Sequence, residues 1–130
     1  MKSLVAGLAA AAAAYVLNRF LIEKAGNKGM NTLIPIAEEA LKTLAAVFFG
    51  APLIQVHSVF GALEAGYEIL GAGGEKGVLG GILSFAAHSL LGLVTVAVFQ
   101  LTRSLLLSIF AASVVHSMWN RVVTYTYTRN

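Results

Sequence analysis

The chain of 130 residues is 58% hydrophobic and only 12% charged, with nine Lys or Arg, six Glu, no Asp and no Cys. A soluble domain averages about 25% charged residues, so this composition excludes most soluble enzymes, disordered chains and charged coiled coils and indicates a membrane protein. Without Cys there is no disulfide framework, no thiolate nucleophile and no Cys-ligated zinc. The net charge of +3 is too small to indicate nucleic-acid binding, and in a membrane protein it is better read as loop charge that sets orientation.

Five stretches are long and apolar enough to cross a hydrocarbon core of about 30 Å, which predicts an all-α polytopic membrane helix bundle. Asn31 and Thr32 are good N-cap residues ahead of Pro35 in the first turn, residues 50–52 form a tight Gly-Ala-Pro break, and residues 71–76 are typical of a loop. The predicted helices are residues 3–22, 31–49, 52–70, 77–101 and 104–123. Together they make one integral membrane domain, residues 1–130.

Loop charges predict the orientation of this domain. Five helices place the termini on opposite sides, with Lys2 and Arg103 on the N-terminal side. The other side holds Lys24, Lys28, Lys76, Arg121 and Arg129. By the positive-inside tendency the N-terminus is outside and the C-terminus cytoplasmic, and we expect an integral protein of a prokaryotic plasma membrane. Lys2 with the apolar stretch that follows is also compatible with a cleavable signal peptide.

The second and third predicted helices carry charges where charges are costly, which makes these residues functional candidates. Glu38 and Glu39 precede Lys42 by four and three residues, so both can face it on one side of a helix. The third helix has one stripe made of His57, Gly61, Glu64 and Glu68. His57 lies about a turn from the outer end of its helix, and we expect an interfacial residue with no special role.

The last two helices add polar groups of their own. His88 stands in a stripe of small residues, which lets a neighbouring backbone come close. That stripe is Gly77, Gly81, Ser84 and Gly92. His116 and Asn120 are four residues apart and therefore neighbours on the fifth helix.

Helix rise predicts that these groups share a depth. At 1.5 Å per residue from the proposed cytoplasmic ends, the polar groups of four helices fall in the same half of the bilayer. The depths are ~10 Å for Glu38, Glu64 and His116, ~16 Å for His88 and ~4 Å for Glu68. Unrelated buried charges have no reason to share a depth, so we expect a single site.

Two chemistries fit Glu, His and Asn without Cys or a Ser-His-Asp set. A carboxylate can act as general base on water while His or Asn stabilises the oxyanion of amide hydrolysis. Alternatively, His88 and His116 with a Glu, for which Glu68 is the candidate, bind a divalent metal such as zinc that activates water. Both predict hydrolysis, and the spacing does not decide between them.

Four short segments, one per helix, resemble the motifs of a known protease family. Glu38-Glu39-Ala-Leu-Lys42 is similar to the Glu-Glu-x-x-Lys motif of PrsW-type intramembrane proteases, whose superfamily includes the CAAX prenyl proteases and the APH subunit of gamma-secretase. The segment from Gly61 to Glu68 resembles the Gly-rich second motif that ends in Glu, which favours Glu68 over Glu64. His88 with the small residues after it resembles the third motif, and His116-Ser-Met-Trp-Asn120 the closing His-x-x-x-Asn.

The resemblance implies a membrane-embedded protease acting on a membrane-embedded peptide or protein near the cytoplasmic leaflet. Glu38 or Glu39 would activate water, while His88, His116 and Asn120 shape the site. Two other classes stay open: a non-catalytic scaffold subunit, and a small proton- or cation-coupled transporter or metal-binding membrane protein. The partners expected are the lipid bilayer and copies of the chain or a larger membrane complex, with no nucleic acid.

Overall fold

The chain folds entirely into helices within the part that the structure describes. The computed structural model describes the backbone of residues 1–128 and the side chains of this range except residues 25–30, 124 and 126–128. The helices are α1 (Lys2–Met30), α2 (Leu33–Phe49), α3 (Leu53–Ala72), α4 (Gly74–Thr102) and α5 (Leu105–Thr128). The predicted all-α class is confirmed.

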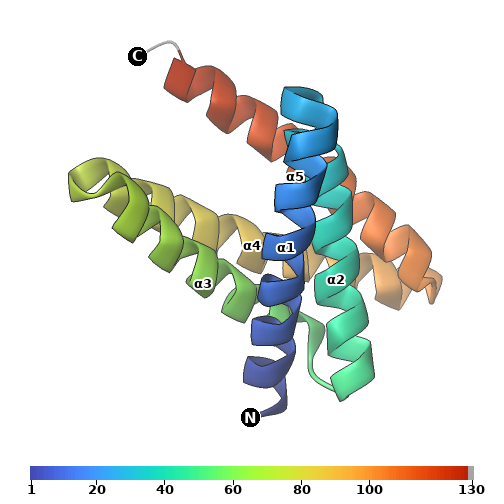
Figure 1. The fold of residues 1–130 in the computed structure, drawn as a ribbon. Coiled ribbons are helices and arrows are strands. Elements are labelled where there is room, and N and C mark those ends of the chain that lie inside the picture. The colour runs from blue at the N-terminus through green and yellow to red at the C-terminus, as the bar shows by residue number, and fades with distance from the viewer. Residues whose placement is uncertain (129–130) are drawn as a thin grey trace.

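Two helical hairpins and a fifth helix build the bundle. α1 and α2 lie side by side, and α3 and α4 form a second hairpin that crosses the first steeply (Figure 1). α5 packs against α4 and α2, so all five helices meet near the crossing. The two termini lie at opposite ends of the molecule (Figure 1).

Several predicted helix ends were wrong. α1 continues to Met30 rather than ending near Ile22, since single Gly and Asn residues lower helix propensity without breaking a helix. The predicted loop 71–76 is reduced to Gly73, since Gly73 and Gly74 both adopt positive φ and turn the chain within two residues.

Of the two residues that cap α2, one makes the predicted capping contacts and the other does not. Gly50 ends α2 as predicted, in the left-handed conformation with its N–H bonded to the last carbonyls. Thr32 occupies the N-cap position, as predicted. Its side chain makes no capping hydrogen bond, so it does not stabilise the start of α2 in the way that an N-cap side chain usually does.

A stripe of alanines lets α1 approach its neighbours. Ala6, Ala10 and Ala14 recur every four residues and are buried, Ala6 with Ala46 and Val56 and the other two with Phe60. Small side chains at helical spacing allow close helix packing through van der Waals contact. The Ala-rich sequence of α1 is therefore the surface on which α2 and α3 pack.

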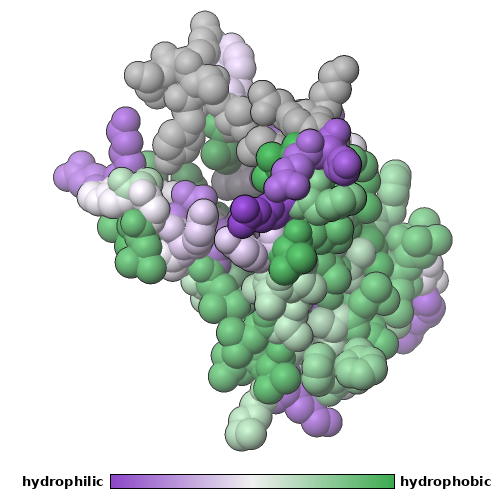
Figure 2. All heavy atoms as spheres, viewed as in Figure 1, coloured by the Kyte–Doolittle hydropathy of each residue, from purple (hydrophilic) through white to green (hydrophobic). Residues whose placement is uncertain are grey.

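The distribution of side chains is the reverse of a soluble protein. Lys42, His57 and Glu39 are the largest of the fully buried side chains, whereas leucines, phenylalanines and valines of all five helices are exposed. Figure 2 shows one face that is largely hydrophobic, with hydrophilic groups gathered in limited areas. Large exposed apolar surface combined with buried charge fits a lipid surround.

Three helices are long and apolar enough to cross a membrane by length and composition. They are Lys2–Lys24 within α1, Gly74–Thr102 and Leu105–Val123. α2 is shorter, at 17 residues, and carries Glu38, Glu39 and Lys42. α2 and α3 are not among these helices, so the membrane crossing of these two helices stays a prediction.

Candidate functional site

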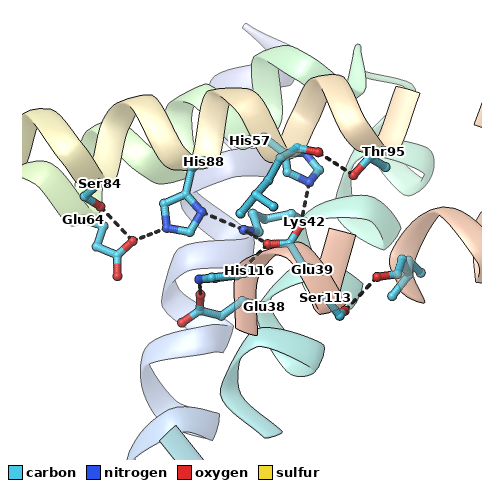
Figure 3. A network of polar contacts seen from close by, with 12 residues as sticks. Glu38, Glu39, Lys42, His57, Glu64, Ser84, His88, Thr95, Ser113 and His116 are labelled. Atoms are coloured by element: carbon cyan, nitrogen blue, oxygen red, sulfur yellow. Dashed lines mark hydrogen bonds and ion pairs between the residues drawn. The ribbon is translucent and has the colours of Figure 1, made fainter. Parts of the chain in front are cut away.

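The centre of the polar network is Glu39 of α2, which is fully buried. Its Oε1 accepts hydrogen bonds from Lys42 Nζ at 2.5 Å and from His116 Nδ1 at 2.9 Å. Its Oε2 lies 3.2 Å from His57 Nε2 (Figure 3). A buried carboxylate is tolerable when it is paired and hydrogen-bonded in this way. Glu39 thus joins α2, α3 and α5.

Lys42 carries the network on to α4. Its Nζ also donates to His88 Nδ1 at 2.9 Å, and His88 Nε2 contacts Glu64 Oε2. Since an ammonium has no lone pair, His88 Nδ1 must be the acceptor and the ring proton lies on Nε2, facing Glu64. Ser84 Oγ donates to the same Glu64 oxygen at 3.0 Å.

Glu38 turns away from Lys42 toward α1 and α5. Its Oε1 accepts a hydrogen bond from Asn18 Nδ2 at 2.6 Å, and its Oε2 lies 3.9 Å from His116 Nε2. The prediction that both Glu38 and Glu39 face Lys42 is thus met by the ion pair of Glu39 alone. Successive residues point about 100° apart on a helix, so two adjacent glutamates reach different partners.

The contact between Glu38 and His116 has a specific chemistry. His116 donates from Nδ1 to Glu39, so in a neutral ring Nε2 is an acceptor that faces the acceptor Oε2 of Glu38. When both ring nitrogens carry protons, the same contact is an ion pair at 3.9 Å. His116 thus lies between the two glutamates, with Nδ1 on Glu39 and Nε2 on the side of Glu38.

His57 differs from its prediction. It is fully buried rather than interfacial, with Nδ1 bonded to the Leu53 carbonyl at 2.9 Å and Nε2 facing Glu39. Gly92 of α4 makes room for it, since a Cβ at Gly92 would lie 2.9 Å from His57 Cβ. The distance along α3 placed His57 near a membrane surface, but the steep crossing of the hairpins brings it to the centre.

A cavity of about 700 Å³, here called the inner cavity, adjoins this network. Glu38, Glu64, His88 and His116 line it, whereas Glu39 and Lys42 do not. The network therefore has two layers, one that lies away from the cavity and holds the helices together, and one that lines the cavity while staying largely buried.

The predicted site residues divide accordingly. Glu38, Glu39, Lys42, His88 and His116 lie together. Asn120 lines the inner cavity one turn beyond His116. Glu68 is exposed and also lines this cavity, but no hydrogen bond or ion pair of Glu68 is found among the described residues. Glu64, one turn earlier, is the carboxylate that contacts His88.

Sequence reasoning missed two residues of the network. Asn18 has no role assigned from the sequence, and only the packing of α1 against α2 brings it to Glu38. Ser84 was noted for its size, not for its hydroxyl. An Asn next to an Arg is a weak signal, since such polar residues are common near membrane surfaces.

A metal could be held by Glu38, His88 and His116, whose three ligand atoms all lie within 4.8 Å of one another. This set replaces the predicted candidate Glu68 with Glu38. The donors suit zinc, and the carboxylate of Glu39 on His116 Nδ1 is the usual outer partner of a metal-binding imidazole. Glu64 competes for His88 Nε2, so the same residues also satisfy one another without a metal.

Comparison with known proteins identified no relative of the chain. No protein-family model, no curated protein and no solved structure matches the chain. The motif resemblance to PrsW-type proteases therefore stays a hypothesis, and the chemistry of the site has to be argued from its own residues.

Proposed function

We propose that the chain is an intramembrane peptidase that hydrolyses a peptide bond of a membrane-associated substrate with water activated by Glu38. The observation that carries the proposal is the Glu38–His116 pair at 3.9 Å, positioned at the wall of the inner cavity. Asn18 holds one oxygen of Glu38 and leaves the other for a water molecule. Glu39 is not the base in this proposal because it does not line the inner cavity and its Oε1 already accepts hydrogen bonds from Lys42 and His116.

In the proposed reaction, Glu38 takes a proton from water as the water oxygen attacks the peptide carbonyl carbon. The tetrahedral oxyanion needs hydrogen-bond donors, and the amide of Asn120 lines the same cavity. The proton held by Glu38 then passes to the leaving amine as the C–N bond breaks. Glu39 and Lys42 are positioning residues, since they hold His116 and His88 without facing the cavity.

A bound metal is the second form of this proposal, supported by the three ligand atoms of Glu38, His88 and His116. A divalent metal would lower the pKa of its bound water and so supply the nucleophile. The contribution of the chain would then be to hold the ion and orient the peptide.

Glu38→Gln tests the general-base role. In proteoliposomes with membrane-anchored peptides, this variant is expected to lose 100-fold or more of the cleavage rate, since general-base catalysis contributes about 10²–10⁴-fold. Glu75→Gln, at an exposed residue that does not line the inner cavity, is the matched control and should cleave at close to the wild-type rate. Chelation before the assay separates the two forms, because only the metal-bound form loses activity and regains it with zinc.

Unchanged cleavage by Glu38→Gln would overturn the proposal. Absence of cleavage by the wild-type chain, with ion flux that Glu38→Gln abolishes, would instead favour the transporter class. Neither flux nor cleavage would favour a scaffold.

A further inference from the structure

A second cavity of about 590 Å³ lies between α1 and α3, and is here called the lateral cavity. It shares part of its wall with the inner cavity, namely Asn18, Ile22, Glu38, Glu64 and Tyr67. The two cavities therefore meet at the carboxylates of the candidate site. In Figure 2 the surface is hollowed between the α3–α4 hairpin and α1, beside a group of hydrophilic residues.

The two cavities differ in what surrounds them. Ala11, Ala14, Phe60 and Leu63 give the lateral cavity a mainly apolar wall. Exposed Tyr15 and Leu63 stand at its edge, within the apolar surface of the molecule. The inner cavity instead reaches Glu68, Lys76 and Asn120 toward the far ends of α3, α4 and α5. The exposed ion pair of Arg19 and Glu23 also lines the lateral cavity, at the end farther along α1. The lateral cavity thus has apolar residues on one side and a polar end, while the inner cavity extends toward the ends of α3, α4 and α5.

Asn18 stands where the cavities meet and has an unused acceptor. Its Nδ2 donates to Glu38, while its Oδ1 is buried without a hydrogen-bond partner among the described residues. Such a group costs about 1–3 kcal/mol unless it is satisfied. A peptide N–H arriving at the junction is a partner of the right kind.

We propose that the lateral cavity admits an unwound apolar segment of the substrate from the bilayer, between α1 and α3, and delivers it to Glu38. This inference rests on the proposed function and names its substrate class: a chain with an apolar stretch on one side of the scissile bond and a polar end on the other. An extended backbone in an apolar surround needs hydrogen-bond partners, and Asn18 supplies an acceptor where the chain leaves the lateral cavity.

The experiment uses Leu63, which lines only the lateral cavity, and Leu90, an exposed residue of α4 that lines neither. A photoreactive amino acid is placed at either position in the full chain in proteoliposomes, and a transmembrane peptide with a polar flank is the probe. We expect crosslinking at position 63 to exceed that at position 90 at least fivefold. Crosslinking needs no catalysis.

Cleavage is measured in parallel for Leu63→Trp and Leu90→Trp. Leu63→Trp fills the lateral cavity and is expected to slow cleavage of the transmembrane peptide at least tenfold. A short water-soluble peptide with the same scissile bond reaches Glu38 through the inner cavity, so its cleavage should change less than twofold. Leu90→Trp should leave both rates unchanged.

The outcomes separate the two proposals. Selective crosslinking without cleavage would overturn the peptidase and leave the lateral cavity as a binding site for apolar peptides. Cleavage with equal crosslinking at both positions, or with equal effects of the two Trp variants, would overturn lateral entry and leave the peptidase standing. If Leu63→Trp slowed the cleavage of both peptides equally, the proposal that the two peptides reach Glu38 through different cavities would also be overturned.

Discussion

Adjacent glutamates have different surroundings in this molecule, and their partners explain the difference. Glu39 is held by Lys42, His57 and His116, while Glu38 is held by Asn18 and faces the cavity. A carboxylate that accepts hydrogen bonds from an ammonium and an imidazole and does not face the cavity has little freedom to take a proton from substrate water. One with a single direct donor keeps an oxygen available.

Lys42→Met tests how much the buried ion pair of Lys42 and Glu39 contributes to the stability of the fold. It leaves Glu39 without its ammonium partner and His88 Nδ1 without its donor. Removing one member of a buried ion pair costs about 3–5 kcal/mol, so we expect a loss of that order in unfolding free energy. Denaturant unfolding in one detergent measures it, with exposed Lys76→Met as control. Equal stability of the two variants would contradict a paired Glu39.

At the scale of the helices, close packing of α3 on α4 positions His88. A Cβ at Gly61 would lie 2.8 Å from His88 Cβ and 3.3 Å from Phe85 Cα. The part of α4 that carries His88 thus meets a glycine of α3, and the two backbones approach closely enough for Glu64 to reach His88.

Gly61→Ala should separate these helices. Overpacking typically costs about 1–3 kcal/mol, and we expect that loss in unfolding free energy together with slower cleavage. Gly66→Ala on the same helix is the matched control, because nothing lies within 4 Å of a Cβ there. The control should gain about 0.5–1 kcal/mol, since alanine loses less backbone entropy than glycine in a helix. A tolerated Gly61→Ala would refute the close approach.

At the scale of the whole molecule, the crossing of the hairpins raises the question of which helices span the membrane. α1, α4 and α5 are apolar and long enough, while α2 and α3 bring the charges. Five crossings and three crossings both place the termini on opposite sides of the membrane. The two arrangements differ in the side on which the connections before and after α2 lie.

Single introduced cysteines can show on which side of the membrane each connection lies, because the chain has no native Cys. With five crossings, an impermeant thiol reagent should label Asn31→Cys from the cytoplasmic side and Ala51→Cys from the outside. With three crossings, both would be labelled from one side. Glu75→Cys, in the first turn of α4, should be labelled from the cytoplasmic side and serves as the orientation control.

Much of this protein follows from the sequence by itself. Composition determined the all-α class and the reversed distribution of side chains, because a chain this apolar satisfies its backbone groups most simply in helices. Gly50 and Pro52 placed the break after α2, and shared depth predicted that Glu38, His88 and His116 would meet.

Tertiary structure decided the rest, because helical spacing gives the face of a residue but not the helix that it meets. The motif favoured Glu68, yet the close approach at Gly61 brings Glu64 to His88. Linear depth put His57 at a surface, yet the crossing of the hairpins buries it against Glu39. Asn18 became part of the site only when α1 packed on α2, since contacts between helices depend on interaxial geometry that no spacing within one helix contains.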